Sequence, residues 1–482
     1  MRTKAVAIRV ETKHLYIHTI GCQMNVYDSE QIALRLMSMG YQQTYSLDMA
    51  DLVIVNTCTI RAKAEQKAFS FLGRLPGLKK KKPGLIVAVG GCVAQQEGKK
   101  IFKRIPHVDM VFGTQAIDRL PGLIQKIEEK RCRIVDVEMV NTPVLSDSLV
   151  GSHQDNAVSR FVTIMRGCDN FCSYCVVPYV RGREISRHPH SIIKEIRELV
   201  QSGIREVTLL GQNVNSYGKK EGLCSFPELL SRVNEIERLL RIRFVTSHPK
   251  DLDDNLILAF RTNQKLCNHI HLPVQSGSNR VLKQMNRNYS RELYLDKITK
   301  LRDTCSDIAI TSDIIVGFPG ETDTDFDQTL DLLRMVEFDS LFAFMYSDRP
   351  NAPAVKFKNK IAPEIMSKRL QILLEIQRNY TMKKNQALVG SIQPILAEGF
   401  SKKQSGRGLD SGSHAVQWTG RTSTNRIVNF FQNDNPESCG DIFPGKPVSI
   451  RIEKAFHHSL WGKPVGKDSI AAGMKGEESY AA

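Results

Sequence analysis

Three cysteines lie close together near the middle of the 482-residue chain, at a spacing that suits metal chemistry. Cys168, Cys172 and Cys175 follow a Cys-x3-Cys-x2-Cys pattern, so three thiolates share one short loop. Full ligation of a cubane cluster of four irons and four sulfurs takes four protein ligands. A set of three leaves one iron open to a small molecule. The spacing therefore predicts a 4Fe–4S cluster with a free coordination site.

Two other uses of cysteine fit this loop less well. A structural zinc site prefers four nitrogen or sulfur ligands, and no nearby His or Cys in the sequence completes the set. Disulfides would leave one of the 11 cysteines unpaired and would need an oxidising compartment. The first 13 residues lack the apolar core of a signal peptide. We therefore expect a cytoplasmic protein that uses cysteines to bind metal.

Three further cysteines occupy the same place in a repeated pattern. Cys22, Cys58 and Cys92 each follow an apolar segment typical of a β-strand. The carboxyl ends of parallel strands meet at one edge of a sheet, where ligands bind in open α/β folds. We therefore expect the three thiols to converge there and to hold a second 4Fe–4S cluster. The alternative is that each is a small buried apolar side chain, as free cysteines often are.

The elements that position these cysteines form an α/β pattern. Apolar strands that alternate with amphipathic helices favour an open parallel sheet with both faces covered. In the first part of the chain we expect strands at 14–20, 51–57, 85–91 and 109–113, with helices at 29–39, 63–75, 95–104 and up to about 130. In the central part six strand–helix units fit an incomplete (β/α)6 barrel, with strands at 161–165, 206–210, 242–246, 269–274, 308–316 and 340–346.

The last part of the chain changes to short β-like runs without strong helices. These runs, at 392–397, 415–419, 427–431 and 448–454, predict a small antiparallel β-barrel. The expected domains are 13–130 for the open sheet, 131–153 for a linker, 154–386 for the incomplete barrel, 387–455 for the small barrel and 456–482 for a frayed tail.

Polar and glycine residues follow the strands of the central part, at the barrel mouth where chemistry occurs in such folds. Glycine at these positions lets the backbone approach a bound nucleoside, although each position alone is also typical of a tight turn. The candidate ligand-binding residues at the mouth are Gly211, Gln212, Asn213, Ser247, Gln275, Asp313 and Gly317.

The net charge of +16 indicates a polyanionic partner. In the small barrel, Trp418, Arg421 and Arg426 combine an aromatic ring with cations, as surfaces that stack nucleic-acid bases do. The alternative is a barrel that only caps the fold. No apolar run reaches the ~18 residues that a membrane helix needs. We therefore expect RNA, and not a membrane, as the partner.

The cysteine loop resembles that of the radical-SAM superfamily, in which the open iron holds the amino and carboxylate groups of S-adenosylmethionine (SAM). One electron from such a cluster cleaves SAM to a 5′-deoxyadenosyl radical. Together with the second cysteine triple and the small barrel, the chain resembles the methylthiotransferase family over about residues 13–455. That family joins an N-terminal methylthiotransferase domain, a radical-SAM core and a C-terminal TRAM domain.

The resemblance assigns roles to particular residues. Cys168, Cys172 and Cys175 would bind the 4Fe–4S cluster that holds SAM, and the other triple would bind an auxiliary 4Fe–4S cluster. Tyr174 matches the aromatic position that packs beside the adenine of SAM. The superfamily often has a Gly-Gly-Glu-like motif after its second strand, where this chain has Leu-Gly-Gln-Asn at 210–213. The SAM contacts of Gln212 and Asn213 therefore differ from that pattern.

Three motifs are similar to the MiaB branch of the family: Arg181–Glu184, His271–Ser278 and Gly420–Phe430. That branch converts N6-dimethylallyladenosine at position 37 of tRNA to its 2-methylthio form, through one SAM that donates a methyl group and a second that yields the radical. The resemblance implies tRNA, an electron donor and a sulfur donor as partners of a monomer. Sibling branches act on threonylcarbamoyladenosine in tRNA or on a ribosomal protein. A non-catalytic iron–sulfur RNA-binding protein is a further alternative, which the open iron disfavours.

Overall fold

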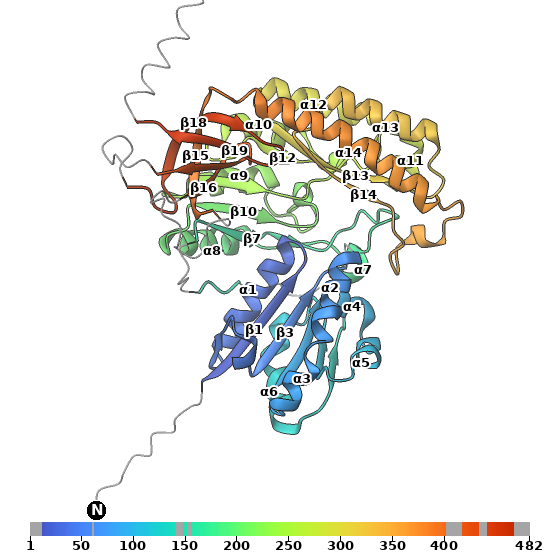
Figure 1. Cartoon of the computed structure of the whole chain (residues 1–482), viewed down its shortest axis with the longest axis vertical. Helices are drawn as coiled ribbons and strands as arrows, with labels where there is room; N and C mark the ends of the chain where they lie inside the picture. Colours follow the sequence, from blue (N-terminus) through green and yellow to red (C-terminus); the bar gives the residue numbers. More distant parts are fainter. Residues whose placement is uncertain are drawn as a thin grey trace, which may run out of the picture. The chain divides into compact units, whose positions relative to one another are not determined.

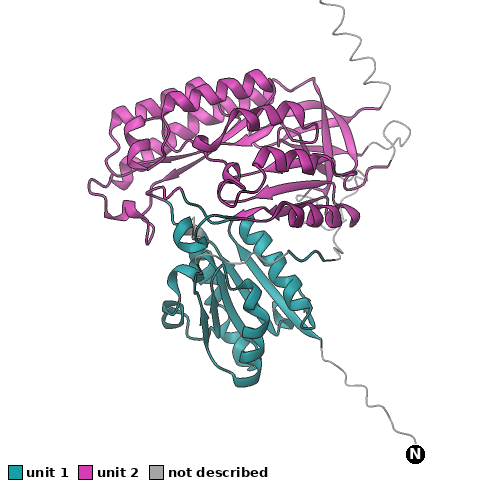
Figure 2. Cartoon of the chain, turned by 180° about the vertical axis from the view of Figure 1, so that it is seen from behind, with its two compact units in different colours: residues 1–151, 166–169, 175–185 teal, residues 152–165, 170–174, 186–482 magenta. Residues whose placement is uncertain are grey.

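The computed structural model describes residues 12–59, 62–140, 148–151, 157–401, 417–432 and 441–466. The chain divides into two compact units (Figure 2). Unit 1 comprises residues 1–151, 166–169 and 175–185, and unit 2 comprises residues 152–165, 170–174 and 186–482. The central cysteine loop thus contributes Cys168 and Cys175 to unit 1 and Cys172 to unit 2. Apart from residues 166–169 and 175–185, the expected central and C-terminal domains belong to unit 2.

Unit 1 contains a six-stranded parallel sheet in the order β2-β1-β3-β4-β5-β6, of which β1 and β3 are labelled in Figure 1. Its strands are β1 (Lys13–Ile20), β2 (Tyr41–Gln43), β3 (Leu52–Thr57), β4 (Ile86–Gly91), β5 (Met110–Phe112) and β6 (Ile134–Asp136). The four expected strands are confirmed, and two three-residue edge strands join them. The boundary expected at 131 is wrong, because β6 pairs with β5 and belongs to the sheet.

Helices cover both faces of this sheet. They are α1 (Gln23–Met37), α2 (Ala62–Leu72), α3 (Pro76–Lys81), α4 (Cys92–Glu97), α5 (Lys100–Arg104) and α6 (Leu120–Lys130), with 3-10 turns η1 (Leu47–Met49) and η2 (Ile117–Arg119). The helix expected at 95–104 is divided at Gly98, which has a φ of +51°. A left-handed residue ends α4 there.

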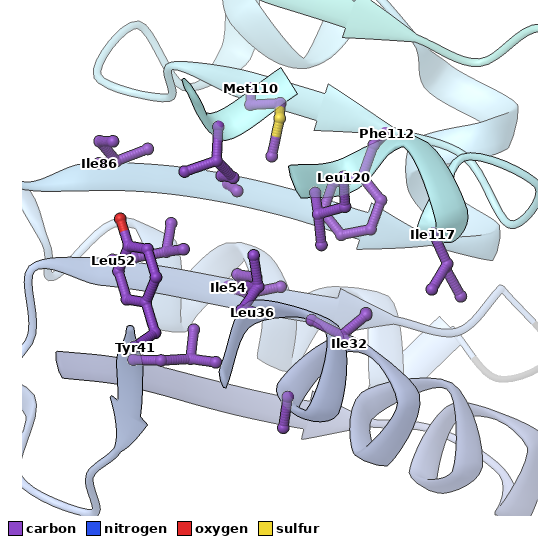
Figure 3. Close-up of a cluster of buried hydrophobic side chains, with 14 of the residues drawn as sticks. Ile32, Leu36, Tyr41, Leu52, Ile54, Ile86, Met110, Phe112, Ile117 and Leu120 are labelled. Atoms are coloured by element: carbon purple, nitrogen blue, oxygen red, sulfur yellow. The ribbon is translucent and has the colours of Figure 1, made fainter. Parts of the chain in front are cut away.

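The two faces of the sheet form two separate hydrophobic clusters because side chains alternate along a strand. Leu52 and Ile54 of β3 pack with Ile32 of α1 on one face (Figure 3). Val53 and Val55 of the same strand pack in the cluster on the other face. Burial on both faces accounts for the unbroken apolar runs of the strand sequences.

The larger part of unit 2 is an incomplete barrel of six parallel strands, as predicted. Two three-stranded sheets, β11-β10-β7 and β12-β13-β14, form it. Their strands are β7 (Ser159–Thr163), β10 (Glu206–Leu210), β11 (Arg241–Phe244), β12 (His269–His271), β13 (Ala309–Val316) and β14 (Ser340–Met345). A bridge between Ile242 and Leu266 links the end of one sheet to the segment before the other.

Helices and short turns connect the barrel strands. The helices are α8 (Pro189–Gln201), α9 (Phe226–Asn234), α10 (Asp254–Thr262), α11 (Asn279–Gln284), α12 (Arg291–Thr304), α13 (Asp323–Val336) and α14 (Pro363–Gln386). The 3-10 turns are η3 (Val214–Ser216), η4 (Pro249–Asp251) and η5 (Pro353–Lys356). Around the cysteine loop lie β8 (Met165–Arg166), α7 (Val177–Arg181) and β9 (Ile185–Ser186). In the described part of the chain, no helix has the length and apolar character needed to span a membrane.

A small closed barrel completes unit 2 in the order β15-β16-β17-β19-β18 (Figure 1). Its strands are β15 (Ile392–Phe400), β16 (Gln417–Thr422), β17 (Ile427–Phe431), β18 (Pro447–Ala455) and β19 (Leu460–Pro464). The tail expected from 456 is wrong up to Pro464, because β19 closes the barrel. It pairs parallel with β17 and antiparallel with β18, so the barrel is not wholly antiparallel as expected. The expected tail beyond 466 lies outside the described residues.

Arg243 of β11 joins the small barrel to the larger one within unit 2. Its guanidinium lies 3.1 Å from Glu206 in an ion pair whose two side chains are each 6% exposed. The same group donates hydrogen bonds to the carbonyl oxygens of Thr422 at 2.7 Å and Ser423 at 3.0 Å. The small barrel is therefore held by a buried charge and not by apolar packing alone.

We expect Arg243→Met to destabilise unit 2 by about 3–5 kcal/mol, because it leaves the Glu206 carboxylate buried without a countercharge. Urea unfolding of the whole chain measures the loss. The double variant Arg243→Met/Glu206→Leu should recover most of it, since the unpaired charge is then gone. A single variant as stable as the parent chain would contradict this role of the pair.

Candidate cluster and SAM sites

The auxiliary cysteines follow three neighbouring strands of the unit 1 sheet. Cys22 lies between β1 and α1, Cys58 follows β3, and Cys92 is the first residue of α4, directly after β4. The sheet order reverses between β1 and β3, because β2 lies on the other side of β1. In open α/β sheets this switch point is where the crevice for a ligand forms. The three thiols thus lie at the edge of the sheet where open α/β folds bind ligands.

The side chains around this edge bring the thiols together. The Cys22 thiol donates a hydrogen bond to Asn25 Oδ1 at 3.2 Å, and Cys22 also lies within hydrogen-bonding reach of Cys58. Gly91, with a φ of +87°, precedes Cys92 where any side chain would overlap Asn56 and Thr57. Glycine is therefore required for β4 to deliver its cysteine this close to β3.

A buried polar layer fixes the walls of the site. Asn25 is fully buried, and its amide donates to Asn56 Oδ1 and to the carbonyl oxygen of Thr57, each at 3.0 Å. The Asn56 amide donates in return to the carbonyl oxygen of Asn25 and to Ser29 Oγ, each at 2.9 Å. This network ties the start of α1 to the end of β3. Neither asparagine was predicted as a site residue, although each lies within three residues of a cysteine.

The electrostatic environment favours a thiolate at Cys22. A hydrogen bond with Cys58 lowers the pKa of Cys22 to about 6, against the opposing effect of burial, and the Arg181 cation adds to the lowering. Burial raises the pKa of Cys92, and Arg181 partly offsets that effect. The thiolate is the form that binds metal. These effects favour the thiolate at Cys22 and the neutral thiol at Cys92.

A cubane places its protein ligands differently from a single metal ion. Among the described residues, no three His, Cys, Asp or Glu side chains are grouped around a point where one metal ion would sit. Each thiolate of a cubane binds a different iron, so its three ligands need not meet at one point. The convergence of Cys22, Cys58 and Cys92 expected from the sequence is present, and their ligation of a cluster stays a prediction.

The central loop contributes buried thiols to both units. Cys168 and Cys172 are 8% and 6% exposed, and Cys175 is half-buried. Within unit 1, the Cys168 amide donates to the carbonyl oxygen of Gly182 at 3.2 Å. Within unit 2, Arg287 Nη1 lies 3.5 Å from the Cys172 sulfur. A cation therefore lies beside this thiol, and Arg287 was not predicted from the sequence.

Arg287 also orders the neighbours of Cys172. It is 4% exposed and donates to the carbonyl oxygen of Pro273 at 2.7 Å and to the Tyr174 hydroxyl at 3.3 Å. Its guanidinium lies 5.2 Å from the ring centre of Tyr289. Tyr174 is therefore held in place from its hydroxyl end, which leaves the ring as its apolar contact surface.

Several buried polar atoms at the ends of β10 and β11 have no hydrogen-bond partner within the described chain. They are Asn213 Oδ1, Asn215 Oδ1 and Nδ2, Ser247 Oγ and His248 Nε2. Buried polar groups are nearly always paired, and leaving one unpaired costs about 1–3 kcal/mol. A polar ligand at the barrel mouth would supply the missing partners. Asn213 and Ser247 were predicted to bind a ligand, whereas Asn215 and His248 were not.

His248 is a neutral hydrogen-bond donor in this group. Its Nδ1 accepts from the Lys250 amide at 3.3 Å, so the ring proton is on Nε2. Burial lowers the pKa of His248, and Arg287 lowers it further. The ring therefore stays uncharged at neutral pH and presents an N–H to the mouth.

The two cysteine triples and the domain order agree with known families. Residues 14–113 match the family described as "Uncharacterized protein family UPF0004", and residues 162–333 match the radical SAM superfamily. A protein from Desulfosudis oleivorans named tRNA-2-methylthio-N(6)-dimethylallyladenosine synthase is 55% identical over 96% of this chain and 98% of its own length. This chain belongs to the tRNA-2-methylthio-N(6)-dimethylallyladenosine synthase family. A member of the family from Syntrophus aciditrophicus is 49% identical over 96% of this chain and 97% of its own length.

Solved structures support the fold. The radical SAM methyltransferase TsrM from Kitasatospora setae, with tryptophan and a SAM analogue bound, has a TM-score of 0.55 at 13% identity. The match covers 76% of this chain and 89% of that one. The form of TsrM with cobalamin and a 4Fe–4S cluster also has a TM-score of 0.55, at 14% identity, and the match covers 80% and 81% of the two chains. The radical-SAM fold expected from the sequence is confirmed.

Other mouth residues expected to bind SAM also have contacts within the chain. Gly211 and Gly317 are positions where a side chain would overlap Met165 and Met366 respectively. Asp313 lies 3.5 Å from the imidazole of His271, and the backbone N–H of Gln275 donates to the carbonyl oxygen of Asp313 at 2.8 Å. Contacts of Gln212 and of these residues with SAM stay predictions.

The expected RNA-stacking role of Trp418 is wrong. Trp418 is 5% exposed and belongs to the hydrophobic core of the small barrel. Arg426 is also engaged internally, since it pairs with Asp339 at 2.6 Å and donates to Asn385 Oδ1 at 3.0 Å. Arg421 pairs with Glu398, and its side chain is 34% exposed. Of the three residues, it is the one whose cation is partly accessible to solvent.

An aromatic pair that is only partly exposed was missed on the same barrel. Phe431 of β17 is 38% exposed and meets Trp461 of β19 edge to face at 6.3 Å. Lys454 lies 5.9 Å from the ring centre of Trp461. An aromatic surface beside a cation is what base stacking uses. The pair was missed because β19 was assigned to the tail.

We expect Ser247→Ala to weaken SAM binding by about five- to thirty-fold, the effect of losing one hydrogen bond of about 1–2 kcal/mol. The variant should be no less stable than the parent, because Ser247 Oγ has no partner in the described chain. Anaerobic equilibrium binding and thermal unfolding measure the two effects. The control is Ser202→Ala, whose hydroxyl caps the end of α8 by donating to Leu199. A loss of stability at position 247 with unchanged SAM affinity would contradict the assignment.

Proposed function

We propose that this chain converts N6-dimethylallyladenosine at position 37 of tRNA to 2-methylthio-N6-dimethylallyladenosine. The observation that carries the proposal is the presence of two cysteine triples. The triple of Cys22, Cys58 and Cys92 lies at the carboxyl ends of β1, β3 and β4. The triple of the central loop has the radical-SAM spacing. Membership of the family named for this reaction gives the same answer.

The two triples would hold two 4Fe–4S clusters, with SAM at the cluster of the central loop. When bound, that cluster and SAM supply a 5′-deoxyadenosyl radical, and the auxiliary cluster supplies a site for sulfur. The residues of the chain bind and orient these groups. Arg287 compensates the charge of the Cys172 thiolate, and the unpaired atoms of Asn213, Asn215, Ser247 and His248 accept and donate hydrogen bonds at the mouth.

The partners follow from the reaction. tRNA is the substrate, so the adenine must leave its stack to reach the barrel mouth. An electron donor must reduce the SAM cluster, and a sulfur donor must replace the sulfur that each product carries away. We propose a cytoplasmic monomer for this work.

Mass spectrometry of nucleosides from the tRNA of a deletion strain tests the substrate. We expect N6-dimethylallyladenosine to accumulate and its 2-methylthio form to disappear, with recovery when the gene is restored. The sibling reaction would change the threonylcarbamoyladenosine derivative instead. A chain that restored the modification without cleaving SAM would overturn the radical mechanism.

We expect Arg421→Ala to weaken tRNA binding and to flatten its dependence on salt. An arginine that contacts phosphate releases counterions when tRNA binds. Its loss therefore lowers the slope of log affinity against log salt concentration by about one. tRNA affinity at two salt concentrations measures both effects, and cluster content should not change. Arg426→Ala is the matched variant, because its guanidinium is paired with Asp339 and its loss should reduce stability more than salt dependence. Normal binding of Arg421→Ala at both salt concentrations would exclude this residue from the tRNA surface.

A further inference from the structure

A buried charge pair lies beside the auxiliary cysteines in unit 1. Arg181 ends α7 and forms an ion pair with Asp28 at 2.9 Å, with side chains that are 5% and 3% exposed. Burying two charges costs desolvation that their attraction offsets only in part. A pair of hydrophobic side chains would stabilise the fold about as well, so the pair suggests a role beyond folding.

The position of the pair indicates that role. Asp28 lies on α1, which begins directly after Cys22, and α7 packs against α4, which begins at Cys92. The Arg181 guanidinium interacts electrostatically with both Cys92 and Cys22. Arg181 therefore faces two of the three thiols.

The pair is rigidly held. Thr114 Oγ1 donates a 2.6 Å hydrogen bond to the carbonyl oxygen of Val180, which fixes the end of α7 within unit 1. One oxygen of Asp28 accepts from Arg181, and the other, Oδ1, has no hydrogen-bond partner in the described chain. The two charges are thus fixed within unit 1, and arginine stays charged at any pH the protein meets.

Fixed charges act on the energy of adding an electron to a cluster. A cubane core of charge +2 with three thiolates has a net charge of about −1, and one electron brings it to about −2. A nearby cation stabilises the more negative form, and a nearby anion destabilises it. In a buried site these effects are screened far less than in water.

We propose that Arg181 and Asp28 set the reduction potential of the auxiliary cluster, with Arg181 raising it and Asp28 lowering it. The inference rests on the proposed function, since it requires the auxiliary cluster at Cys22, Cys58 and Cys92. In this role Arg181 is a positioning residue that acts through the cluster and does not touch the tRNA.

The test isolates the auxiliary cluster. In a background with Ala at Cys168, Cys172 and Cys175, the reconstituted chain should hold about four irons. A titration with dithionite, followed by electron paramagnetic resonance, gives the potential of the one-electron step. We expect Arg181→Gln to lower the equilibrium constant for reduction at least tenfold, which is about 59 mV for one electron. Asp28→Asn should shift it in the opposite direction.

Two further variants separate this effect from folding. Arg181→Gln leaves Asp28 unpaired, whereas Arg181→Gln/Asp28→Asn removes both charges at nearly constant volume and should give a potential between those of the single variants. Arg119→Gln removes a surface arginine of unit 1 that pairs with Asp136 at 2.6 Å, and should leave the potential unchanged.

The outcomes distinguish this inference from the proposed function. Full iron content with an unchanged potential in Asp28→Asn and in the double variant would overturn the inference alone. The absence of iron from the background chain would overturn the auxiliary ligand set and the inference with it. Shifts of opposite sign in the two single variants would support it, because a merely structural pair predicts lower stability and no ordered change in potential.

Discussion

Replacement of Cys168, Cys172 and Cys175 by Ala is expected to halve the iron content, from about eight to about four, and to abolish reductive SAM cleavage. The reason is that the second triple is complete without the loop, since its thiols follow β1, β3 and β4 of unit 1. Iron and sulfide analysis after anaerobic reconstitution gives the first number. Chromatographic assay of 5′-deoxyadenosine gives the second.

Two cysteines outside both triples provide the control. Cys132 is exposed and Cys224 is half-buried, and neither follows a strand of the unit 1 sheet at its binding edge. The variant Cys132→Ser/Cys224→Ser should keep about eight irons and cleave SAM normally. A loop variant that kept all its iron, or a control that lost half of it, would show that the cysteines are grouped wrongly.

The sheet of unit 1 was predictable because its signals are local. Apolar runs separated by helical periodicity indicate a parallel sheet, and a parallel sheet gathers its carboxyl ends at one edge. The position of Cys22, Cys58 and Cys92 after successive strands was therefore enough to predict their convergence. The glycine before Cys92 belongs to the same signal, since close approach of β4 to β3 requires it.

The small barrel was predicted less well because pairing between distant segments decides it. β19 has five residues, Leu460–Pro464, and its strand character depends on β17 and β18 as partners. The burial of Trp418 had a local signal that was not used. Trp418 and Arg421 are three residues apart on β16, so their side chains point to opposite faces and cannot share one surface.

The buried arginines had no usable signal in the sequence. Arg181 pairs with Asp28, which is 153 residues away, and Arg287 contacts Cys172, which is 115 residues away. In a chain with 67 Lys and Arg residues, nothing local marks the few that are buried. Only the fold shows that each triple of cysteines has a cation beside it.

Cys22→Ala is expected to stop methylthio transfer while sparing reductive SAM cleavage, whereas Cys172→Ala is expected to abolish both. Cys22 follows β1 in unit 1, and in the proposed function its loss removes one ligand of the auxiliary cluster. Cys172 lies beside Arg287 in the loop proposed to bind the SAM cluster. Without it the radical cannot form, so no later step can proceed.

One reaction with tRNA measures both activities, since 5′-deoxyadenosine reports SAM cleavage and the 2-methylthio nucleoside reports transfer. Thermal unfolding of each variant without iron identifies any loss of fold, and Cys22→Ser provides a side chain closer in size to cysteine. If Cys22→Ala and Cys22→Ser unfold like the parent chain yet lose SAM cleavage as fully as Cys172→Ala, the two triples do not have separate roles. If cleavage persists and transfer stops, the auxiliary thiols act after the radical forms, because the radical is then made but no sulfur reaches the adenine.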